Sequence, residues 1–498
     1  MAPGSAVSEL ASAVSGDLIR TGRADPVIVD VTHDSRQAVP GFLFVAIEGE
    51  NADGHRYVPD AVAAGATAVC VSLEMHSGVP EIVVEDTRAV LGPLAAIVHG
   101  RPTESLRVIA VTGTDGKTTV THYIESIGIT AGLSTGLVGT IQTRYAGRSV
   151  DSERTTPEAS DFQRLLAEML SSGVSLVAVE VSSHALALRR VAGTRFAVAA
   201  FTNLSQDHLD FHGDMSSYLA AKRSLFDTYE VETAVINVDD QAGSEIAASY
   251  EGDLITVGES GDVRVKDVSP TPSGTTFTLA TPWGSARLTA PVRGEFNVDN
   301  AALAAACCLS AGITFDQVVA GLEDLSPIPG RFEVVSEGED PMTVIVDYAH
   351  TPRSISEVIA AARSMTRGRV IALGGAGGER DREKRPMMGR ALSGADLAVV
   401  TSDNPRSEDP EKIVEEVASG LAPGTDSLVV VDRREAIGAA VAAAGQGDLV
   451  LVLGRGHEPM QESGGEKRPF DDRTVASEVL AEARKSANSP SESGSMGQ

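Results

Sequence analysis

The stretch VTGTDGKTT, Val111 to Thr119, decides the fold of the middle of this chain. It follows the apolar run RVIAV and precedes a segment that places Val120, Ile124 and Ile127 on one helical face. Glycines permit a tight loop whose backbone N–H groups point at phosphates, and the following helix adds its dipole. The general pattern begins with glycine where this chain has Val111, so the loop is a shortened variant. Strand, loop and helix together predict a nucleotide-binding P-loop rather than a chance glycine turn.

The side chains of this loop predict how a nucleotide would be held. Lys117 can reach the β- and γ-phosphates, and the Thr118 hydroxyl can ligate Mg²⁺. The other ATP-binding candidates in the loop are Gly113, Thr114, Asp115, Gly116 and Thr119.

Strands and helices alternate on both sides of the P-loop, which predicts an α/β protein of three domains. Short apolar runs in residues 1–105 predict a small mixed α/β domain. Residues 106–335 predict a central ATP-binding parallel sheet, interrupted by a β-rich stretch at 263–292. Residues 336–485 predict a Rossmann-like parallel sheet, and the Ser/Gly/Pro-rich residues 486–498 predict a disordered tail.

Composition excludes several classes of function. The chain has 498 residues, too many for one core, and 41 Lys and Arg against 69 Asp and Glu, a net charge of −28. Such an acidic chain is not expected to bind nucleic acid or an anionic membrane, although an anionic small substrate stays possible. The N-terminus does not resemble a signal peptide, and no apolar run approaches the roughly 18 residues of a membrane span. Cys70, Cys307 and Cys308 lack metal or redox spacing, so we expect buried thiols in a cytoplasmic protein.

Two polar residues outside the P-loop are candidates for metal binding. Glu180 lies in the apolar run AVEV, where a carboxylate is unfavourable to bury unless it is paired or metal-bound; an edge strand is the alternative. His208 follows the run VAAFTN, close to Asp207 and Asp210. Alone it could cap a helix or fill a core, but beside a P-loop it predicts a role in organising Mg²⁺.

Four further residues have structural alternatives. Lys222, flanked by alanines on a helix predicted from about Ser216, has the spacing of a surface lysine. Thr156, Asn297 and Asn300 can each be read as helix caps.

The predicted strands of residues 336–485 end in the polar loops DYAHTP, GGAGGERD, SDNPR and GRGHE. If the strands are parallel, these loops meet at one edge, where ligands bind in such sheets. By composition alone, TSDNPRSEDP (Thr401 to Pro410) could equally be a surface turn.

Taken in order, these motifs resemble the Mur ligase family, the ATP-dependent amino-acid ligases of peptidoglycan synthesis. The matches span residues 113–458: TGTDGKTT, TTPE, EVSSHAL, FTNLSQDHLDFHG, AAK, GEFNVDN, PGRFE, DYAHTP, GGERDREKRP, DNPR and GRGHE. The segments DSR and NADGHRY extend the resemblance into the first domain. It is greatest to the members that add meso-diaminopimelate to UDP-N-acetylmuramoyl-L-alanyl-D-glutamate.

The resemblance implies that ATP phosphorylates the D-glutamate side chain and that the amine of the incoming amino acid attacks the acyl phosphate. It implies Lys117, Glu180, His208 and Lys222 as catalytic residues, with Mg²⁺ held by Thr118, Glu180 and His208, and with Lys222 carbamylated. The implied binding residues are Ser35 for uridine; Thr155, Thr156, Ser182 and Arg190 for the muramoyl-peptide; Asn297, Arg331 and Asp347 for ATP; and Arg380, Asp403, Asn404, Pro405, Arg406, Gly454 and Glu458 for the amino acid.

Arg406 is the residue expected to select the amino acid. Its planar guanidinium can bind the far carboxylate of diaminopimelate through two parallel hydrogen bonds, and Pro405 would set the backbone that aims it. Two positions depart from the family pattern: Asp115 replaces the usual Asn, and Leu188 replaces a Gln found in some members.

The alternatives are a sister ligase that adds lysine or ornithine, a folylpolyglutamate synthase, and, in a different class, a P-loop regulatory NTPase. We expect a monomer acting on small molecules.

Overall fold

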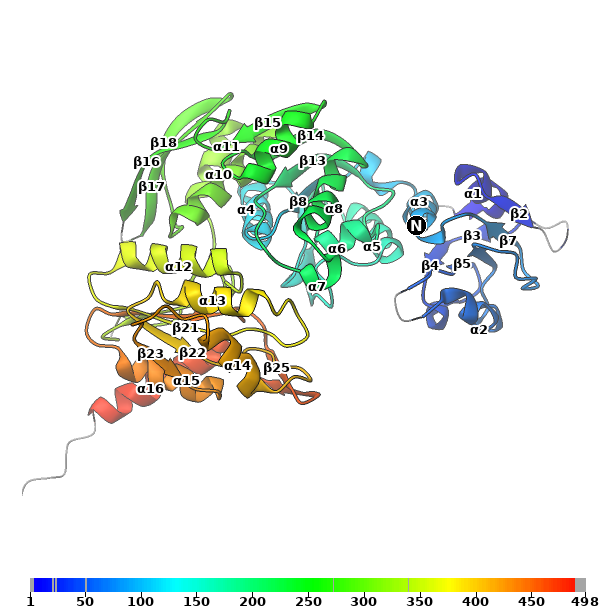
Figure 1. The fold of residues 1–498 in the computed structure, drawn as a ribbon. Helices are drawn as coiled ribbons and strands as arrows, with labels where there is room; N and C mark the ends of the chain where they lie inside the picture. Colours follow the sequence, from blue (N-terminus) through cyan, green and yellow to red (C-terminus); the bar gives the residue numbers. More distant parts are fainter. Residues whose placement is uncertain are drawn as a thin grey trace, which may run out of the picture.

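The computed structural model describes residues 4–19, 22, 25–49, 52–271, 273–338 and 340–488. The tail predicted for 486–498 lies outside these residues from 489 onward. Three main sheets organise the chain, and Figure 1 shows the N-terminal and C-terminal units lying against different sides of the central one. The predicted boundaries at 105 and 335 stay predictions.

The N-terminal unit is a mixed sheet, in which β2 runs antiparallel to β7 and the other pairs are parallel. Its helices α1 and α3 pack on one face, and α2 packs on the other. The sheet order is β2 (Asp17–Ile19), β7 (Glu81–Val83), β6 (Ala68–Val71), β5 (Phe42–Val45) and β4 (Asp30–Thr32), with α1 (Val7–Ala13), α2 (Val58–Ala64), α3 (Thr87–Val98) and a small pair of strands, β1 (Ser5–Ala6) and β3 (Val27–Ile28). The 3₁₀ helices η1 (Ser35–Gln37) and η2 (Gly54–Tyr57) lie in its loops, and η3 (Pro102–Glu104) leads out of it.

The central unit is an eight-stranded sheet that is parallel from β9 to β15. Its order is β11 (Arg148–Asp151), β10 (Gln142–Tyr145), β9 (Thr135–Val138), β12 (Leu176–Glu180), β8 (Arg107–Thr112), β13 (Arg195–Phe201), β14 (Glu230–Asn237) and β15 (Asp253–Val257). The edge strands β10 and β11 form an antiparallel hairpin, which the sequence analysis did not predict.

Helices cover both faces of the central sheet. One face carries α4 (Lys117–Thr130), α10 (Glu295–Ser310) and α11 (Phe315–Glu323); the other carries α5 (Ala159–Ser171), α6 (Ser183–Ala187), α8 (Met215–Asp227) and α9 (Gln241–Ser249). The predicted face of α4 is confirmed, since Val120, Ile124 and Ile127 are fully buried. The β-rich stretch is also confirmed, as an antiparallel sheet of β16 (Arg264–Thr271), β17 (Gly274–Thr281) and β18 (Gly284–Ala290).

The C-terminal unit is a six-stranded sheet whose strands are parallel except β19. Its order is β19 (Glu333–Val334), β20 (Thr343–Asp347), β24 (Leu449–Leu453), β21 (Val370–Gly374), β22 (Leu397–Val400) and β23 (Ser427–Val429). One face carries α12 (Pro352–Met365), α13 (Lys384–Leu392) and α14 (Pro410–Ala418), and the other carries α15 (Arg433–Ala443) and α16 (Asp472–Asn488). The four polar loops follow parallel strands, so they emerge at one edge, as expected.

One small element completes the fold. The hairpin of β25 (Met460–Ser463) and β26 (Glu466–Pro469) follows β24 directly.

Cys70, Cys307 and Cys308 are free and buried, as predicted. Among the described residues, no helix combines the length and the apolar character that a membrane crossing requires.

Candidate active site

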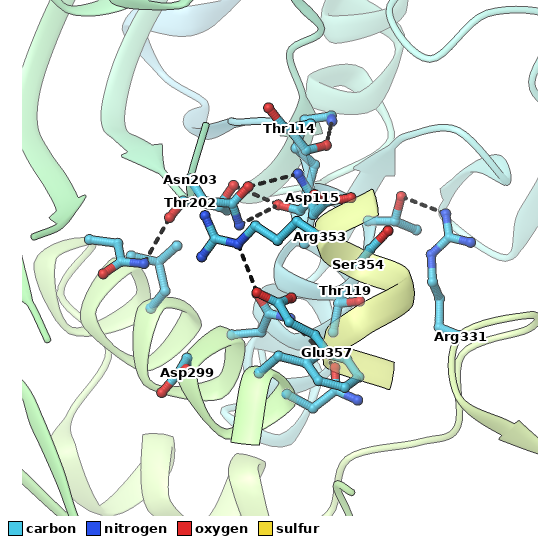
Figure 2. A pocket seen from close by; sticks show the side chains of 18 of the residues that line it. Thr114, Asp115, Thr119, Thr202, Asn203, Asp299, Arg331, Arg353, Ser354 and Glu357 are labelled. Carbon is cyan, nitrogen blue, oxygen red and sulfur yellow. Dashed lines mark hydrogen bonds and ion pairs between the residues drawn. The ribbon is translucent and has the colours of Figure 1, made fainter. Parts of the chain in front are cut away.

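A cleft of about 640 Å³ opens between the central and C-terminal units. The P-loop, the residues after β12 and β13, and the start of α10 line it from the central unit, and residues 347–358 line it from the C-terminal unit. Figure 2 shows Arg353 and Glu357 of α12 beside Asp115 and Asn203 of the central unit. The parallel strands therefore bring the predicted P-loop and a loop of the third sheet to one space.

The P-loop turns tightly after β8 and begins α4. Gly113 has φ 141°, and a Cβ there would lie 1.8 Å from Thr202 Oγ1, so only glycine fits. Lys117 Nζ donates to the carbonyls of Gly113 at 3.0 Å and Thr114 at 2.8 Å. Burial lowers the pKa of Lys117, while the charges of Glu180 and other nearby carboxylates act to raise it.

Glu180 ends the central strand β12 and is fully buried, so the edge-strand alternative is wrong. Its Oε2 accepts hydrogen bonds from the hydroxyls of Thr118 and Thr140, both at 2.9 Å, and its Oε1 accepts one from the backbone N–H of Thr140 at 2.8 Å. These three donors compensate the burial of the charge. They also hold the carboxylate next to the Thr118 hydroxyl of the P-loop.

Lys222 is buried, with 1 % of its surface exposed, so the surface-lysine alternative is wrong. Its Nζ donates to the Gly113 carbonyl at 2.5 Å and lies 4.3 Å from the centre of the Tyr218 ring. Burial, with a further contribution from Lys117, lowers the pKa of Lys222 well below its usual value. The small alanine neighbours do not bury this lysine. It is buried because the orientation of α8 directs its side chain towards the P-loop.

His208 lies in the loop after β13 with φ 55°, which is unusual for a residue other than glycine. It occupies the N-cap position of the short helix α7 (Leu209–His212) without a side-chain cap bond, and its side chain is 34 % exposed, so neither the capping nor the core alternative holds. Its Nε2 lies 3.4 Å from Asp207 Oδ2. Burial lowers the pKa of His208 to about 3, which leaves the imidazole neutral and able to ligate a metal.

The muramoyl-peptide candidates gather beside Glu180. The Thr156 hydroxyl donates to the Glu180 carbonyl at 2.8 Å, so Thr156 is not the predicted helix cap; Glu158 precedes α5 instead. Thr155 Oγ1 lies 3.1 Å from Thr140 Oγ1, and Ser182 caps α6. Arg190 Nε forms an ion pair with Glu158 at 2.8 Å. Ser35 stands apart from this group, half-exposed on η1 of the N-terminal unit.

The three nucleotide candidates outside the P-loop border the same cleft. Arg331 donates from Nη2 to Thr118 Oγ1 at 3.1 Å, and its guanidinium lies 4.3 Å from the centre of the Tyr348 ring. Asp347 accepts the backbone N–H groups of Phe332 and Ala349, at 2.6 and 2.7 Å, and burial raises its pKa.

The helix-cap alternative for the two asparagines is wrong. Helix α10 begins at Glu295 after Gly294, so Asn297 and Asn300 lie inside the helix. Asn297 bonds to the Arg293 carbonyl at 2.9 Å.

The amino-acid candidates form a group at the carboxyl edge of the C-terminal sheet. Asp403 and Asn404 are each only 9 % exposed, so the surface-turn alternative for SDNPR is wrong. Asn404 Nδ2 donates to Glu458 Oε2 at 2.7 Å. Burial and the charge of Asp403 raise the pKa of Glu458. The Asp403 carboxylate lies against Gly454, where a Cβ would be 2.5 Å from its Oδ2.

Two arginines at this edge point in different directions: Arg406 towards the 377–380 loop, and Arg380 towards the central unit. Arg406 follows Pro405 and donates from Nη1 to the Gly378 carbonyl at 2.5 Å. In the part of the chain that the structure describes, Arg406 forms no ion pair with a carboxylate. Arg380 borders the cleft and lies 3.7 Å from Asp210 of the central unit.

Asp115, the departure from the family pattern, has its carboxylate hydrogen-bonded. It accepts from Ser205 Oγ at 3.1 Å and from Thr351 Oγ1 at 3.3 Å. Thr351 belongs to the C-terminal unit, so the extra charge in the P-loop contacts the opposite side of the cleft.

Several supporting residues had no role in the sequence analysis. Arg455 is fully buried and donates from Nη1 to Asn404 Oδ1 at 2.7 Å, and Lys384 pairs with Asp207 at 2.9 Å. Both stand inside motifs already quoted, GRGHE and GGERDREKRP. The sequence could have marked them only as basic residues in polar loops, since their partners lie far away along the chain.

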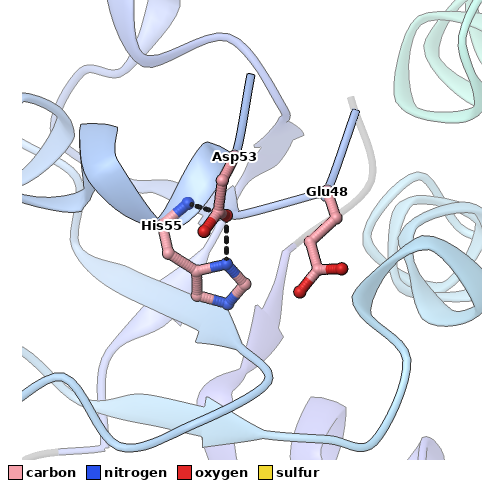
Figure 3. Close-up of side chains that lie close together, drawn as sticks. All are labelled: Glu48, Asp53 and His55. Atoms are coloured by element: carbon pink, nitrogen blue, oxygen red, sulfur yellow. Dashed lines mark hydrogen bonds and ion pairs between the residues drawn. The ribbon is translucent and has the colours of Figure 1, made fainter. Parts of the chain in front are cut away.

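Glu48, Asp53 and His55 form a separate cluster in the N-terminal unit (Figure 3). His55 Nδ1 contacts Asp53 at 2.7 Å, and Nε2 accepts the backbone N–H of Ser72 at 2.9 Å. Because both ring nitrogens have protein partners, the cluster serves the structure of this loop.

Family models match all three units of this chain. They are the Mur ligase family catalytic domain over residues 27–98, the Mur ligase middle domain over 111–308, and the Mur ligase glutamate ligase domain over 330–456. The chain therefore belongs to the Mur ligase family.

Its similar relatives include proteins named UDP-N-acetylmuramoyl-L-alanyl-D-glutamate–2,6-diaminopimelate ligase. The one from Gloeobacter violaceus is 45 % identical over 463 residues, covering 92 % of this chain and 94 % of the relative. The one from Aquifex aeolicus is 43 % identical, covering 90 % and 93 %.

Solved structures agree with the fold. One of a ligase of the same name superposes with a TM-score of 0.69 at 30 % identity, covering 97 % of this chain and 99 % of the other. The MurF ligase of Thermotoga maritima, in complex with ADP, shares the fold with a TM-score of 0.64 at 19 % identity, covering 92 % and 98 %. The predicted α/β class with three domains is confirmed.

Proposed function

We propose that this chain is an ATP-dependent ligase that joins meso-diaminopimelate to the D-glutamate of UDP-N-acetylmuramoyl-L-alanyl-D-glutamate. The observation that carries the proposal is the meeting, at one cleft, of P-loop groups from the central sheet with loops from the carboxyl edge of the C-terminal sheet. Relatives of 42–45 % identity over nearly the whole chain are named for this reaction. The enzyme acts as a cytoplasmic monomer.

The three domains divide the substrates among them. Residues 1–105, with Ser35, bind the uridine end, and 106–335 bind ATP and the peptide end. Residues 336–485 bind the amino acid at the edge formed by the loops after β20, β21, β22 and β24. A long substrate bound in this way extends from the N-terminal unit to the cleft.

The residues at the P-loop fit a bound Mg²⁺. Hydroxyl and carboxylate oxygens are the ligands this ion prefers, and Thr118 and Glu180 present such oxygens 2.9 Å apart. Neutral His208 completes the set of three. When bound, Mg²⁺ supplies positive charge that neutralises the transferring phosphoryl group.

The chain's own cations hold the phosphates. Lys117 now bonds to carbonyls of its own loop, and it exchanges these for phosphate oxygens when ATP binds. Arg331, in contact with Thr118, adds a guanidinium on the same side. Catalysis of phosphoryl transfer is mainly positioning and charge stabilisation, which these groups provide.

The reaction then proceeds in two transfers. An oxygen of the D-glutamate side-chain carboxylate bonds to the γ-phosphorus of ATP, and ADP leaves. The amine nitrogen of diaminopimelate bonds to the resulting acyl carbon, inorganic phosphate leaves, and the amine loses a proton. Thr155, Thr156, Ser182 and Arg190 hold the muramoyl-peptide during both transfers.

Lys222 is carbamylated in the working enzyme. Its lowered pKa favours the unprotonated amine, which can bond to the carbon of CO₂ with release of a proton. The product is an anion beside Lys117 and the P-loop, where it helps to hold cations. Lys222 is buried and, among the described residues, forms no ion pair with a carboxylate. This supports the proposal, since an anion there would meet the positive charge of Lys117.

An activity assay with three amino acids, each supplied separately, tests the proposed function. Purified protein, ATP, Mg²⁺ and UDP-N-acetylmuramoyl-L-alanyl-D-glutamate are mixed with diaminopimelate, lysine or ornithine in parallel. We expect ADP release only when both the UDP-substrate and diaminopimelate are present. A preference for lysine would refute the specificity and leave the ligase chemistry standing. ADP release indifferent to either substrate would instead identify a regulatory NTPase.

A further inference from the structure

Three polar contacts join the segment after β13 to residues 380–384, which lead from the loop after β21 into α13. Gln206 Nε2 donates to Asp381 Oδ2 at 3.0 Å, Lys384 Nζ donates to Asp207 Oδ1 at 2.9 Å, and Arg380 lies 3.7 Å from Asp210. In each pair, one residue belongs to the central unit (Gln206, Asp207 or Asp210) and the other to the C-terminal unit (Asp381, Lys384 or Arg380). The 206–210 segment, which carries His208, is therefore a docking surface for the C-terminal unit.

Lys384 occupies a position in its helix that does not favour a buried lysine. It is the first residue of α13, where the helix dipole disfavours a cation, and it is 6 % exposed. The Asp207 carboxylate compensates both costs, although it lies 177 residues earlier in the chain. A residue whose local preference conflicts with its position is expected at a functional or strained site.

Asp207 stands between this lysine and two imidazoles. One oxygen, Oδ1, binds Lys384, while Oδ2 lies 3.4 Å from His208 Nε2 and 3.6 Å from His350 Nε2. A histidine that ligates a metal through one ring nitrogen commonly donates its other N–H to a carboxylate, which fixes the tautomer and the ring. At 3.4 Å, Asp207 Oδ2 is close enough to accept this bond from His208 Nε2 after a small shift, which leaves the Nδ1 lone pair of His208 for a metal.

We propose that Lys384 is a positioning residue: by pairing with Asp207, it fixes the imidazole of His208 for the metal. The inference rests on the proposed function. Without Lys384, the buried Asp207 loses its cation and draws the two imidazoles towards itself. Because Lys384 belongs to the C-terminal unit, the metal site of the central unit is complete only when the two units are docked.

The test measures metal binding directly, with Mn²⁺ as the probe and ADP present, by electron paramagnetic resonance. Lys384→Met keeps the length of the side chain and removes its charge; we expect its Mn²⁺ dissociation constant to rise about tenfold. We expect Lys384→Arg to restore most of the affinity. The kcat of Lys384→Met falls while its KM for diaminopimelate stays near that of the wild type.

Gln206→Ala is the matched control, because it removes the neighbouring contact between the units and leaves Asp207 paired. We expect its Mn²⁺ affinity to equal that of the wild type. If Lys384→Met binds Mn²⁺ normally, or Gln206→Ala weakens binding as much, Lys384 is only an interface residue and the inference is wrong.

The double variant Asp207→Asn/Lys384→Met guards against a folding defect, since it leaves no unpaired charge. We expect it to fold and to bind Mn²⁺ weakly; wild-type affinity in this variant would also overturn the inference. A wild-type protein that binds Mn²⁺ but forms no product would count against the proposed function alone.

Discussion

Arg406 combines an unusual backbone with a side chain that no carboxylate of the described chain neutralises. Its φ of 54° is in the left-handed region, and its backbone N–H and carbonyl bond to Glu462 and Gly464 at 2.9 and 2.7 Å. A non-glycine residue keeps such a conformation only where its surroundings hold it, which is common at binding sites. Among the described residues, the only hydrogen bond of the guanidinium is to the Gly378 carbonyl, so it retains donors for an anionic ligand.

Arg406→Ala should lower kcat/KM for diaminopimelate by a factor on the order of 10² or more, since a charged bidentate contact is lost. Arg406→Lys is the matched variant: it keeps the charge and loses the fork, so its activity should lie between the two. The measurement is steady-state kinetics with diaminopimelate varied at saturating ATP. Unchanged kinetics in Arg406→Ala would remove Arg406 from the site, whereas a rise in lysine addition would strengthen its role in specificity.

At the scale of elements, the apolar runs predicted the parallel strands well, because buried strands are continuous stretches of Val, Ile, Leu and Ala. The hairpin of β10 and β11 was missed since β11 is exposed along its whole length and its sequence RSVD is largely polar. The hairpin of β25 and β26 was also missed, although Gly464 and Gly465, with φ 59° and 80°, are a known hairpin signal. That second hairpin matters for the site, because Ser463 forms a β-bridge with Arg406.

The position of a single residue was predictable where a motif carried it, as for Lys117 at the start of α4. The burial of a side chain was not predictable in this way. The spacing of Lys222 along its helix does not show whether its face of the helix packs against the protein or faces solvent. Pairs such as Asp207 and Lys384 depend on how two sheets dock, and no local pattern encodes that.

Glu408 anchors the loop after β22 to α13, and its contribution to the free energy of unfolding should depend on pH. Its carboxylate accepts from Arg385 Nη2 at 2.9 Å and from Arg382 Nη2 at 2.8 Å. The Arg385 hydrogen bonds lower the pKa of Glu408 from 4.5 to about 2. Because the folded pKa is below the unfolded one, the stabilisation is complete above about pH 4.5 and is lost as the pH falls through 2.

Glu408→Gln should therefore lower the free energy of unfolding by about 1 kcal/mol at pH 7, allowing for solvent screening. The difference from the wild type should shrink as the pH falls from 4.5 towards 2, as urea titrations across this range would show. Glu478→Gln, which breaks an exposed pair with Arg434, is the control and should cost less. A difference that stays constant with pH would show that the Glu408 charge does not stabilise the loop.

At the scale of the whole molecule, a partly buried group of contacts around Asp30 helps to hold the N-terminal unit to the central one. Arg164 of α5 reaches Asp30 of β4 with Nε at 2.8 Å and Nη2 at 3.1 Å, and Nη2 also donates to the Val31 carbonyl at 3.0 Å. His99 Nε2 lies 3.0 Å from the same carboxylate. Arg164 thus joins the two units together with other contacts, among them His33 Nδ1 with Ser160 Oγ at 3.1 Å and Arg88 with Glu158 at 3.6 Å.

Arg164→Leu should loosen this docking and misplace Ser35, the residue proposed for uridine binding, relative to the P-loop. We expect KM for the UDP-substrate to rise about tenfold while KM for ATP changes little, because the residues proposed to bind ATP all lie in the other two domains. Arg195→Ala is the matched control, since Arg195 pairs with Glu230 and Glu232 within the central sheet. Equal increases in both KM values for Arg164→Leu would indicate a general loss of folding. An unchanged KM for the UDP-substrate would show that the Asp30 contacts do not orient the N-terminal unit.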